Sequence, residues 1–204
     1  MICAVRSVAV FCGSNPGRRP EYADGAVALA LALVAREVRV VYGGARVGMM
    51  GLLADAALAA GGEVVGVIPR QLLDAELAHP GLSELHVVAS MHERKALMAE
   101  LSDGFVAPPG GIGTLEEFAE VTTWSKLGLH AKPTGLLNVL GYYDRLLGFL
   151  DHAVDERFLR DEHRGIVLTD AHPGPLLDAM ERWTPPVGAR WIDADGRAYD
   201  PGRA

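Results

Sequence analysis

The chain has 204 residues, 50% of them hydrophobic, and a formal net charge of -7 at pH 7. This length and apolar content suit one domain with a substantial core. The negative charge argues against a nucleic-acid polymer as partner, because binding one requires a basic face. No apolar stretch stays free of glycine and charge for the roughly 20 residues of a membrane span, so no membrane partner is expected. Cys3 and Cys12 form no CxxC pair, which predicts neither a zinc site nor a disulfide framework and favours a reducing, cytoplasmic setting.

Segments typical of strands and of helices alternate along the chain. Short apolar runs predict strands at 7–12, 38–42, 63–68, 84–88, from Phe105, at 133–138 and at 165–169. Helices are predicted at 21–36, 49–60, 90–101, after the turn at 109–113, at 142–157 and at 175–183, with 69–82 irregular. This alternation predicts an α/β fold with three layers, in which helices cover both faces of a doubly wound parallel sheet. We expect a single domain over residues 1–183 and an irregular tail over 184–204.

Two glycine-rich turns each join a predicted strand to a predicted helix. The turn at 43–48 (GGARVG) lacks the GxGxxG pattern and a ribose-binding acidic residue, so NAD is disfavoured. Gly43 and Gly44 either let a ligand approach the backbone or serve only a tight connection with positive φ. Ligands bind parallel sheets beyond the carboxyl ends of the strands. The loops after the first, second and fifth strands, which include Ser14 and Gly43, are therefore expected to gather around one site.

The second turn, at 109–117, reads PGGIGTLEE. Its glycines allow close approach of a ligand, and the unpaired amides of the following helix N-terminus suit a phosphate. Glu116 and Glu117 add carboxylates that a purely anion-binding turn does not need. Thr114 and Glu117 also match a capping box, in which Glu117 would only stabilise the helix. Because consecutive helical residues are about 100° apart, the two glutamates have different roles, and the sequence leaves open which one faces the ligand. Glu120 is interpreted as a solvent-facing charge.

Arg94 breaks the pattern of its own predicted helix. Ser90 and Glu93 match a capping box, and Met91, Leu97, Met98 and Leu101 share a stripe with Arg94. A guanidinium on an apolar stripe is a local rule broken without evident compensation, which is typical of a functional site. The alternatives are that Arg94 extends its charge to solvent or pairs with a core carboxylate. His92 lies off the stripe and is interpreted as solvent-exposed.

Three segments together resemble the Lonely Guy (LOG) family of cytokinin-activating phosphoribohydrolases, whose members were long mislabelled as lysine decarboxylases. They are MHERK at 91–95, PGGIGTLEE at 109–117 and TTWSKLGLHAKPTGLLN at 122–138. The first two contain the family's Arg-Lys pair and its hallmark PGGxGTxxE. The resemblance implies a Rossmann-like fold, a homodimer, and hydrolysis of the N-glycosidic bond of a nucleoside 5′-monophosphate to free base and ribose 5-phosphate. Two departures are Ala45, where the family usually has a third glycine, and Pro108, which replaces a usual aliphatic residue.

The resemblance also implies site residues. It implies substrate contacts at Glu76, Arg94, Lys95, Gly110, Gly111, Ile112, Gly113, Thr114, Leu115, Glu116 and Thr122, and we expect catalytic roles for Arg94 and Glu117 from the chemistry of the reaction. Ser14, Gly43 and Gly44 join them through the expected gathering of loops.

The chemistry of this reaction fits these residues. Cleaving a ribosyl C–N bond builds positive charge on the sugar, which a carboxylate such as Glu117 can stabilise, or the carboxylate can activate the attacking water. The turn amides and Thr114 would hold the 5′-phosphate. Arg94 would grip phosphate or ribose, or assist the departing base. No step requires a cofactor or a metal.

Two other functions compete with hydrolysis. A nucleotide-binding or carrier protein would use the same cleft without turnover, and the Glu116 and Glu117 pair is the feature against it. A pyridoxal phosphate-dependent lysine decarboxylase would need a Schiff-base lysine among Lys95, Lys126 and Lys132, but no pyridoxal-type pattern is visible.

Overall fold

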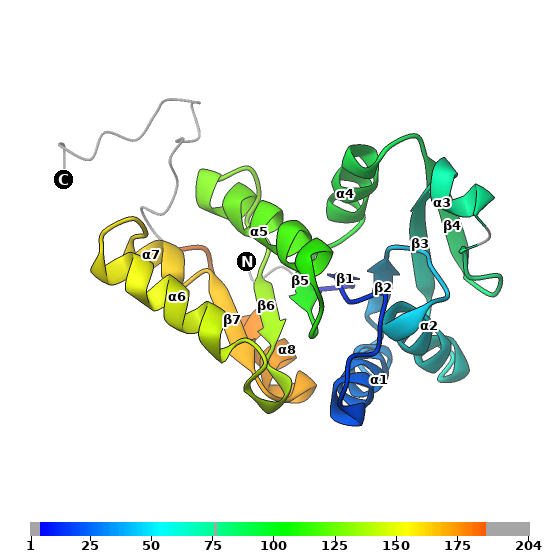
Figure 1. The fold of residues 1–204 in the computed structure, drawn as a ribbon, viewed down its shortest axis with the longest axis horizontal. Helices are drawn as coiled ribbons and strands as arrows, with labels where there is room; N and C mark the ends of the chain where they lie inside the picture. The colour runs from blue at the N-terminus through cyan, green and yellow to red at the C-terminus, as the bar shows by residue number, and fades with distance from the viewer. Residues whose placement is uncertain (1–4, 76, 187–204) are drawn as a thin grey trace.

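Seven parallel strands form the centre of the protein in a computed structural model that describes residues 5–75 and 77–186 (Figure 1). The strands are β1 (Ser7–Val10), β2 (Arg39–Tyr42), β3 (Val64–Pro69), β4 (Glu84–Val88), β5 (Gly104–Ala107), β6 (Thr134–Leu137) and β7 (Val167–Asp170). Their order in the sheet is β4-β3-β2-β1-β5-β6-β7, and every pairing is parallel. All seven predicted strands are present, and the doubly wound α/β prediction is confirmed.

The helices mostly follow the predicted segments. They are α1 (Pro20–Val34), α2 (Gly48–Ala59), α3 (Arg70–Asp74), α4 (Met91–Glu100), α5 (Ile112–Leu127), η1 (Val139–Gly141), α6 (Asp144–Asp155), α7 (Asp161–Arg164) and α8 (Pro173–Arg182). The prediction of an irregular stretch at 69–82 was wrong over α3, and α7 was not predicted. Both helices are too short to show a helical period in the sequence. The predicted helix at 142–157 begins later, at Asp144, after a turn in which Leu140 and Gly141 have φ values of 53° and 71°.

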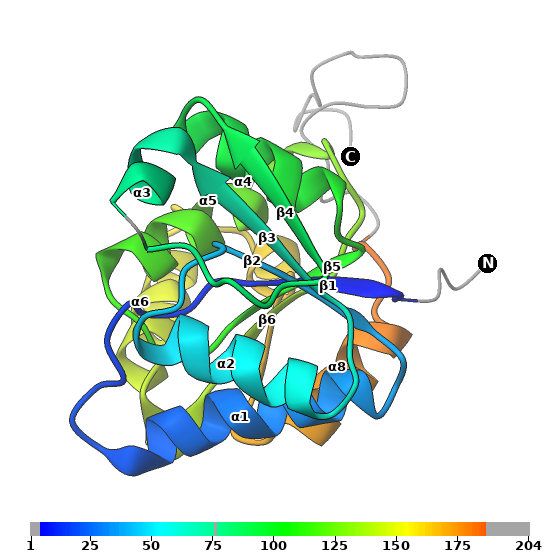
Figure 2. The ribbon, with the colours of Figure 1, turned by 90° about the vertical axis from the view of Figure 1, so that its right-hand side faces the viewer.

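Helices cover both faces of the sheet, as Figure 2 shows, with α1, α2 and α8 on one face and α4 and α5 on the other. Side chains of a strand alternate between its faces. In β1, Val8 and Val10 join the core beneath α1 and α2, whereas Ala9 joins the core beneath α4 and α5. The central strands β1, β3, β5 and β6 are buried along their whole length, as expected for a sheet covered on both faces.

The strand order reverses direction at β1, which lies between β2 and β5. The connections after β1 and β5 therefore lead to helices on opposite faces of the sheet, and the crevice at the carboxyl edge between them is where such sheets bind ligands. The two loops approach closely, since a Cβ added to Gly13 would lie 3.5 Å from Gly110 Cα. The predicted glycine turn therefore lies at the edge of the sheet where a ligand site is expected.

Among the described residues, no helix combines the length and apolarity needed to cross a membrane. The predicted tail at 184–204 lies outside the described residues from position 187 onward.

Candidate functional site

A cavity of about 360 Å³ opens at the carboxyl edge of the sheet, where the loops after β1, β2 and β5 meet. The helices α2, α3, α4 and α5 contribute the rest of its wall. Predicted site residues that line it are Ser14, Gly43, Arg94, Gly111, Ile112, Gly113, Thr114 and Glu117. The predicted gathering of three loops is therefore found, and it brings the charged residues of α4 to the glycine turn.

Arg94 and Glu117 form an ion pair across this cavity. Arg94 Nη2 donates to Glu117 Oε1 at 2.5 Å, and the two side chains are only 12% and 9% exposed. Arg94 Nε is buried and has no hydrogen-bond partner among the described residues. Buried donors are normally satisfied, so a ligand or an ordered water is expected there. The sequence left open a core carboxylate as the partner of Arg94, and that partner is the predicted catalytic residue itself.

The environment of Glu117 favours the protonated carboxyl more than water does. Burial raises the pKa of Glu117, and the nearby Arg94 guanidinium only partly offsets this effect. The alternative in which Glu117 serves a capping box with Thr114 was wrong. The helix α5 begins at Ile112 with Gly111 as its N-cap, so Thr114 lies inside the first turn and Glu117 is free to face the cavity.

The glycines of the turn serve two different purposes. A Cβ on Gly110 would lie 2.1 Å from Thr114 Oγ1, so the buried Thr114 side chain excludes any other residue at position 110. Cβ atoms added to Gly111 and Gly113 would meet nothing within 4 Å. At those two positions, glycine leaves the backbone open toward a ligand. The first helical hydrogen bond runs from Leu115 N to Gly111 O, so the amides at 111–114 precede it and suit an anion.

Glu116 lies on a different face of α5 and pairs with Lys95. The Lys95 ammonium also lies 3.0 Å from Glu120, and the lysine side chain is only 7% exposed. Burial alone would lower the pKa of Lys95, but its hydrogen bonds to Glu116 and Glu120 raise it overall. Lys95 therefore stays protonated, which is unsuited to a Schiff base. The interpretation of Glu120 as a solvent-facing charge was wrong, because Glu120 is one of the two carboxylates that hold Lys95.

The buried residues of α4 are not all those of the predicted apolar stripe. Ser90 caps the helix by accepting the Glu93 amide at 3.2 Å, as its capping box predicts. Met98 is buried, but Met91 is 44% exposed, and Lys95 takes a buried position instead. Three ion pairs join α4 to α5, one from Arg94 and two from Lys95, so these two charged residues face inward, which apolar periodicity alone does not reveal.

Gly43 and Gly44 each match one of the two roles predicted for their turn, Gly43 at the cavity and Gly44 in a tight connection with positive φ. Gly43 lines the cavity, and a Cβ there would lie 3.4 Å from Arg94 Nη1, so glycine leaves room for the guanidinium. Gly44 has a φ of 76° and packs toward Ile68. Ala45, the departure from the family pattern, forms an isolated bridge with Ala78 and is buried.

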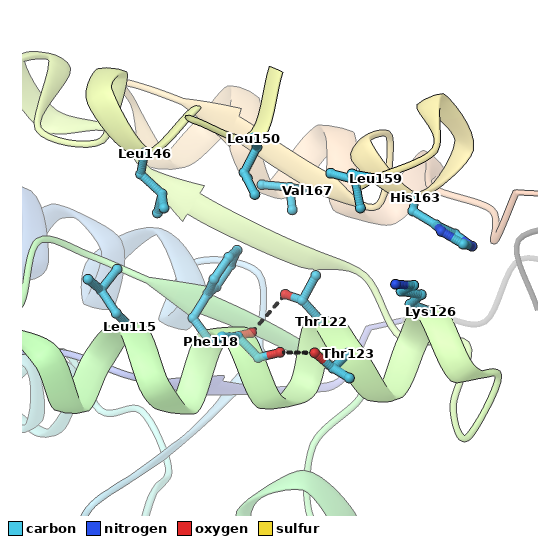
Figure 3. Close-up of a pocket in the computed structure, with 11 residues that line it drawn as sticks. Leu115, Phe118, Thr122, Thr123, Lys126, Leu146, Leu150, Leu159, His163 and Val167 are labelled. Carbon is cyan, nitrogen blue, oxygen red and sulfur yellow. Dashed lines mark hydrogen bonds between the residues drawn. The ribbon is translucent and has the colours of Figure 1, made fainter. Parts of the chain in front are cut away.

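Leu115 and Thr122 do not reach this cavity within one chain. They line a separate, mostly apolar cavity of about 300 Å³ between α5 and the α6–β7 segment (Figure 3). The Thr122 hydroxyl donates to the Phe118 carbonyl at 2.7 Å. Glu76, a further predicted contact, lies outside the described residues.

The sequence missed several residues of the cavity wall. Cys12, Gly13, Met50 and Leu72 line it without having been predicted. Gly13 was detectable, because it follows the first strand directly, but Leu72 lies on a helix too short to predict. Cys12 is a free, buried thiol whose pKa is raised to about 12 by burial and by Glu117. Within the described part of the chain, no group of three or more His, Cys, Asp and Glu side chains could hold a metal ion.

Comparison with known proteins places the chain in a family. The sequence profile of a family described as possible lysine decarboxylase matches residues 50–180. A cytokinin riboside 5′-monophosphate phosphoribohydrolase from Rhodococcoides fascians is 56% identical over 164 residues, covering 80% of this chain and 83% of that protein. A protein of the same name from Arabidopsis thaliana is 49% identical over 180 residues, covering 88% and 79%.

Solved structures share the fold. The X-ray structure of TM1055 aligns with a TM-score of 0.68 at 26% identity, covering 87% of this chain and 99% of that one. The molybdenum cofactor binding protein from Rippkaea orientalis aligns with a TM-score of 0.66 at 19% identity, covering 88% and 97%, and shows a shared fold alone. The sequence relatives decide the family: this chain belongs to the Lonely Guy family, together with the cytokinin riboside 5′-monophosphate phosphoribohydrolases that it matches.

Proposed function

We propose that this protein is a phosphoribohydrolase, which cleaves the N-glycosidic bond of adenosine 5′-monophosphate or an N6-substituted derivative. The products are the free base and ribose 5-phosphate. The observation that carries the proposal is the buried Arg94–Glu117 pair, which faces the same cavity as the open amides of the glycine turn. Relatives that are about half identical carry the name of this activity.

The spacing along α5 supports separate roles for the amides at its N-terminus, which would bind phosphate, and for Glu117, which would act on the sugar. The amides at 111–114 face the cavity from the N-terminus of the helix, where the partial positive charge suits the 5′-phosphate. Glu117 lies one turn further along the same face, roughly 5 Å beyond Thr114 at the rise of an α-helix. A ribose held by its phosphate would then present its anomeric carbon to the Glu117 carboxylate. There the carboxylate stabilises the cationic sugar or removes a proton from the attacking water.

Arg94 supports this chemistry through Glu117. Its positive charge opposes the effect of burial on the Glu117 pKa and so favours the carboxylate that the reaction needs. Its remaining donors are available to the phosphate, the ribose or the departing base. Lys95, Glu116 and Glu120 hold α4 against α5 beside this pair.

Base release from nucleotides tests the proposal. The purified protein, incubated with AMP and with N6-isopentenyl-AMP, is expected to release base and ribose 5-phosphate in equal amounts, measured by chromatography. Glu117→Gln and Arg94→Ala are each expected to lower kcat on the order of 100-fold or more. Glu100→Gln, which removes an exposed carboxylate of α4, serves as the control. AMP that binds in calorimetry but stays intact would instead favour the carrier protein.

We also infer a homodimer built on the face that α5 and α6 expose. None of the α6 residues is buried, and Phe149 and Phe158 are 63% and 86% exposed. The apolar cavity that contains Leu115 and Thr122 opens on this face. The family resemblance assigns both residues to the substrate, and a second copy packed here is the arrangement that would bring them to a site. We place the hydrolase in a single domain over residues 1–183 and in the cytoplasm, where a free thiol such as Cys12 is stable.

A further inference from the structure

Two adjacent tyrosines after β6 hold the glycine turn through hydrogen bonds to its carbonyl groups. The Tyr143 hydroxyl donates to the Pro108 carbonyl at 2.7 Å, and the Tyr142 hydroxyl donates to the Gly110 carbonyl at 2.6 Å. More than 30 residues separate each tyrosine from its acceptor along the chain. The sequence gives no periodic signal for this contact, because it depends on the pairing of β6 beside β5.

The segment that carries the tyrosines is itself held in one conformation. Asn138 Oδ1 accepts the Tyr143 amide at 2.6 Å, and Asn138 Nδ2 donates to Asp144 at 2.7 Å. Leu140 has a φ of 53°, a conformation that costs about 1 kcal/mol or more in a residue other than glycine. Such strain persists where the surroundings determine the backbone. The fixed backbone therefore holds both tyrosines in a defined position beside the turn.

The Tyr142 contact determines the direction of one amide at the site. A trans peptide is planar, and its carbonyl oxygen and amide hydrogen point in opposite directions. The carbonyl of Gly110 and the amide of Gly111 belong to the same peptide unit. A hydroxyl that holds the Gly110 oxygen therefore directs the Gly111 N–H away from Tyr142, and Gly111 lines the candidate cavity. The same hydrogen bond polarises the peptide unit toward stronger donation. Glycine has no side chain to restrict this peptide, so an external hydrogen bond is needed.

We propose that Tyr142 is a positioning residue that orients the Gly111 amide toward the 5′-phosphate of the substrate, a role that rests on the function proposed above. The Tyr142 hydroxyl makes its hydrogen bond to the Gly110 carbonyl, and Tyr142 is 41% exposed, so its hydroxyl contributes little to the core. Its ring packs edge-to-face with Tyr22 of α1, with centroids 5.4 Å apart. Removing the hydroxyl keeps this ring contact and frees the peptide to rotate.

Tyr142→Phe tests the role, with Tyr22→Phe as a matched control. Within the described part of the chain, the Tyr22 hydroxyl makes no hydrogen bond, and Tyr22→Phe keeps the same ring pair. Tyr142→Phe is expected to raise the KM for AMP, and the calorimetric Kd for AMP in a Glu117→Gln background, roughly three- to tenfold. Its kcat should stay within about twofold, and Tyr22→Phe should change neither constant.

The outcomes separate this role from a structural one and from failure of the proposed function. A merely structural tyrosine would lower the active fraction, and therefore kcat, without raising Kd. An unchanged Kd in Tyr142→Phe, or an equal rise in Tyr22→Phe, overturns the proposal. Should the wild-type protein bind AMP without releasing base, the proposed hydrolysis fails, while the Kd comparison still decides the role of Tyr142. Should AMP not bind, both proposals fall.

Discussion

At the scale of single residues, Glu117 is distinguished by its burial, its ion pair and its position on α5. It is nearly inaccessible, it pairs with Arg94, and it lies one helical turn beyond amides that suit a phosphate. Glu116, its neighbour in sequence, is 53% exposed and pairs with Lys95 instead. The 100° between consecutive helical residues thus divides two identical side chains between the cavity and an ion pair that joins two helices.

The pKa of Glu117 makes a prediction about pH. Because burial raises this pKa, base release is expected to fall at a higher pH on the acid side than an ordinary glutamate would produce, as the carboxylate becomes protonated. Arg94→Met removes the charge that opposes burial, so the Glu117 pKa should rise further. Carbon-13 NMR titration of the Glu117 carboxyl checks both statements without requiring activity. A titration midpoint below that of free glutamate in the wild-type protein would contradict them.

At the scale of elements, the site depends on loops that approach one another more closely than side chains allow. Gly48 begins α2 with a φ of 57°, and a Cβ there would lie 2.0 Å from the Ser14 carbonyl oxygen. Gly61, after α2, has a φ of 79°, but a Cβ there would meet nothing within 4 Å. The two glycines share a left-handed backbone and differ in crowding.

This difference allows backbone strain and loop contact to be measured separately. Gly61→Ala is expected to lower the free energy of unfolding by about 1 kcal/mol, the cost of a left-handed alanine. Gly48→Ala should cost roughly 3 kcal/mol or more, since the loop that carries Ser14 must move as well. It should also raise the KM for AMP, whereas Gly61→Ala should not. Urea denaturation and steady-state kinetics provide the measurements, and equal losses in the two variants would argue against a loop contact.

At the scale of the whole molecule, the two faces of the sheet differ in how fully their helices are buried. Both faces carry a buried core, but none of the α6 residues is fully buried, and Phe149 of α6 is 63% exposed. Exposed aromatic residues on an amphipathic helix are typical of an interface between chains.

The proposed dimer is tested by charge placed on that face. Phe149→Asp is expected to convert a dimer into a monomer, because the aspartate would lose its hydration in the interface. Leu31→Asp is the control, since Leu31 is 46% exposed on α1, on the opposite face. Light scattering coupled to size exclusion should give twice the mass of one chain for the wild type and for Leu31→Asp. A wild-type protein that elutes as a monomer at all concentrations would refute the dimer.

Glu117 was chosen over Glu116 only through the reaction that the family resemblance implies. The sequence by itself determined the α/β class, the seven strands, the glycine turn, and Arg94 as a charge that breaks its helix pattern. These features follow from local preferences, namely apolar periodicity, the need for glycine at crowded or left-handed positions, and a charge placed against a helix pattern. Only the tertiary structure decided that Glu117 faces the cavity, that Glu120 joins Lys95, that Thr122 faces a separate cavity, and that Tyr142 holds Gly110. Each of these contacts depends on how helices rotate and strands pair, which packing between distant segments sets and local sequence does not.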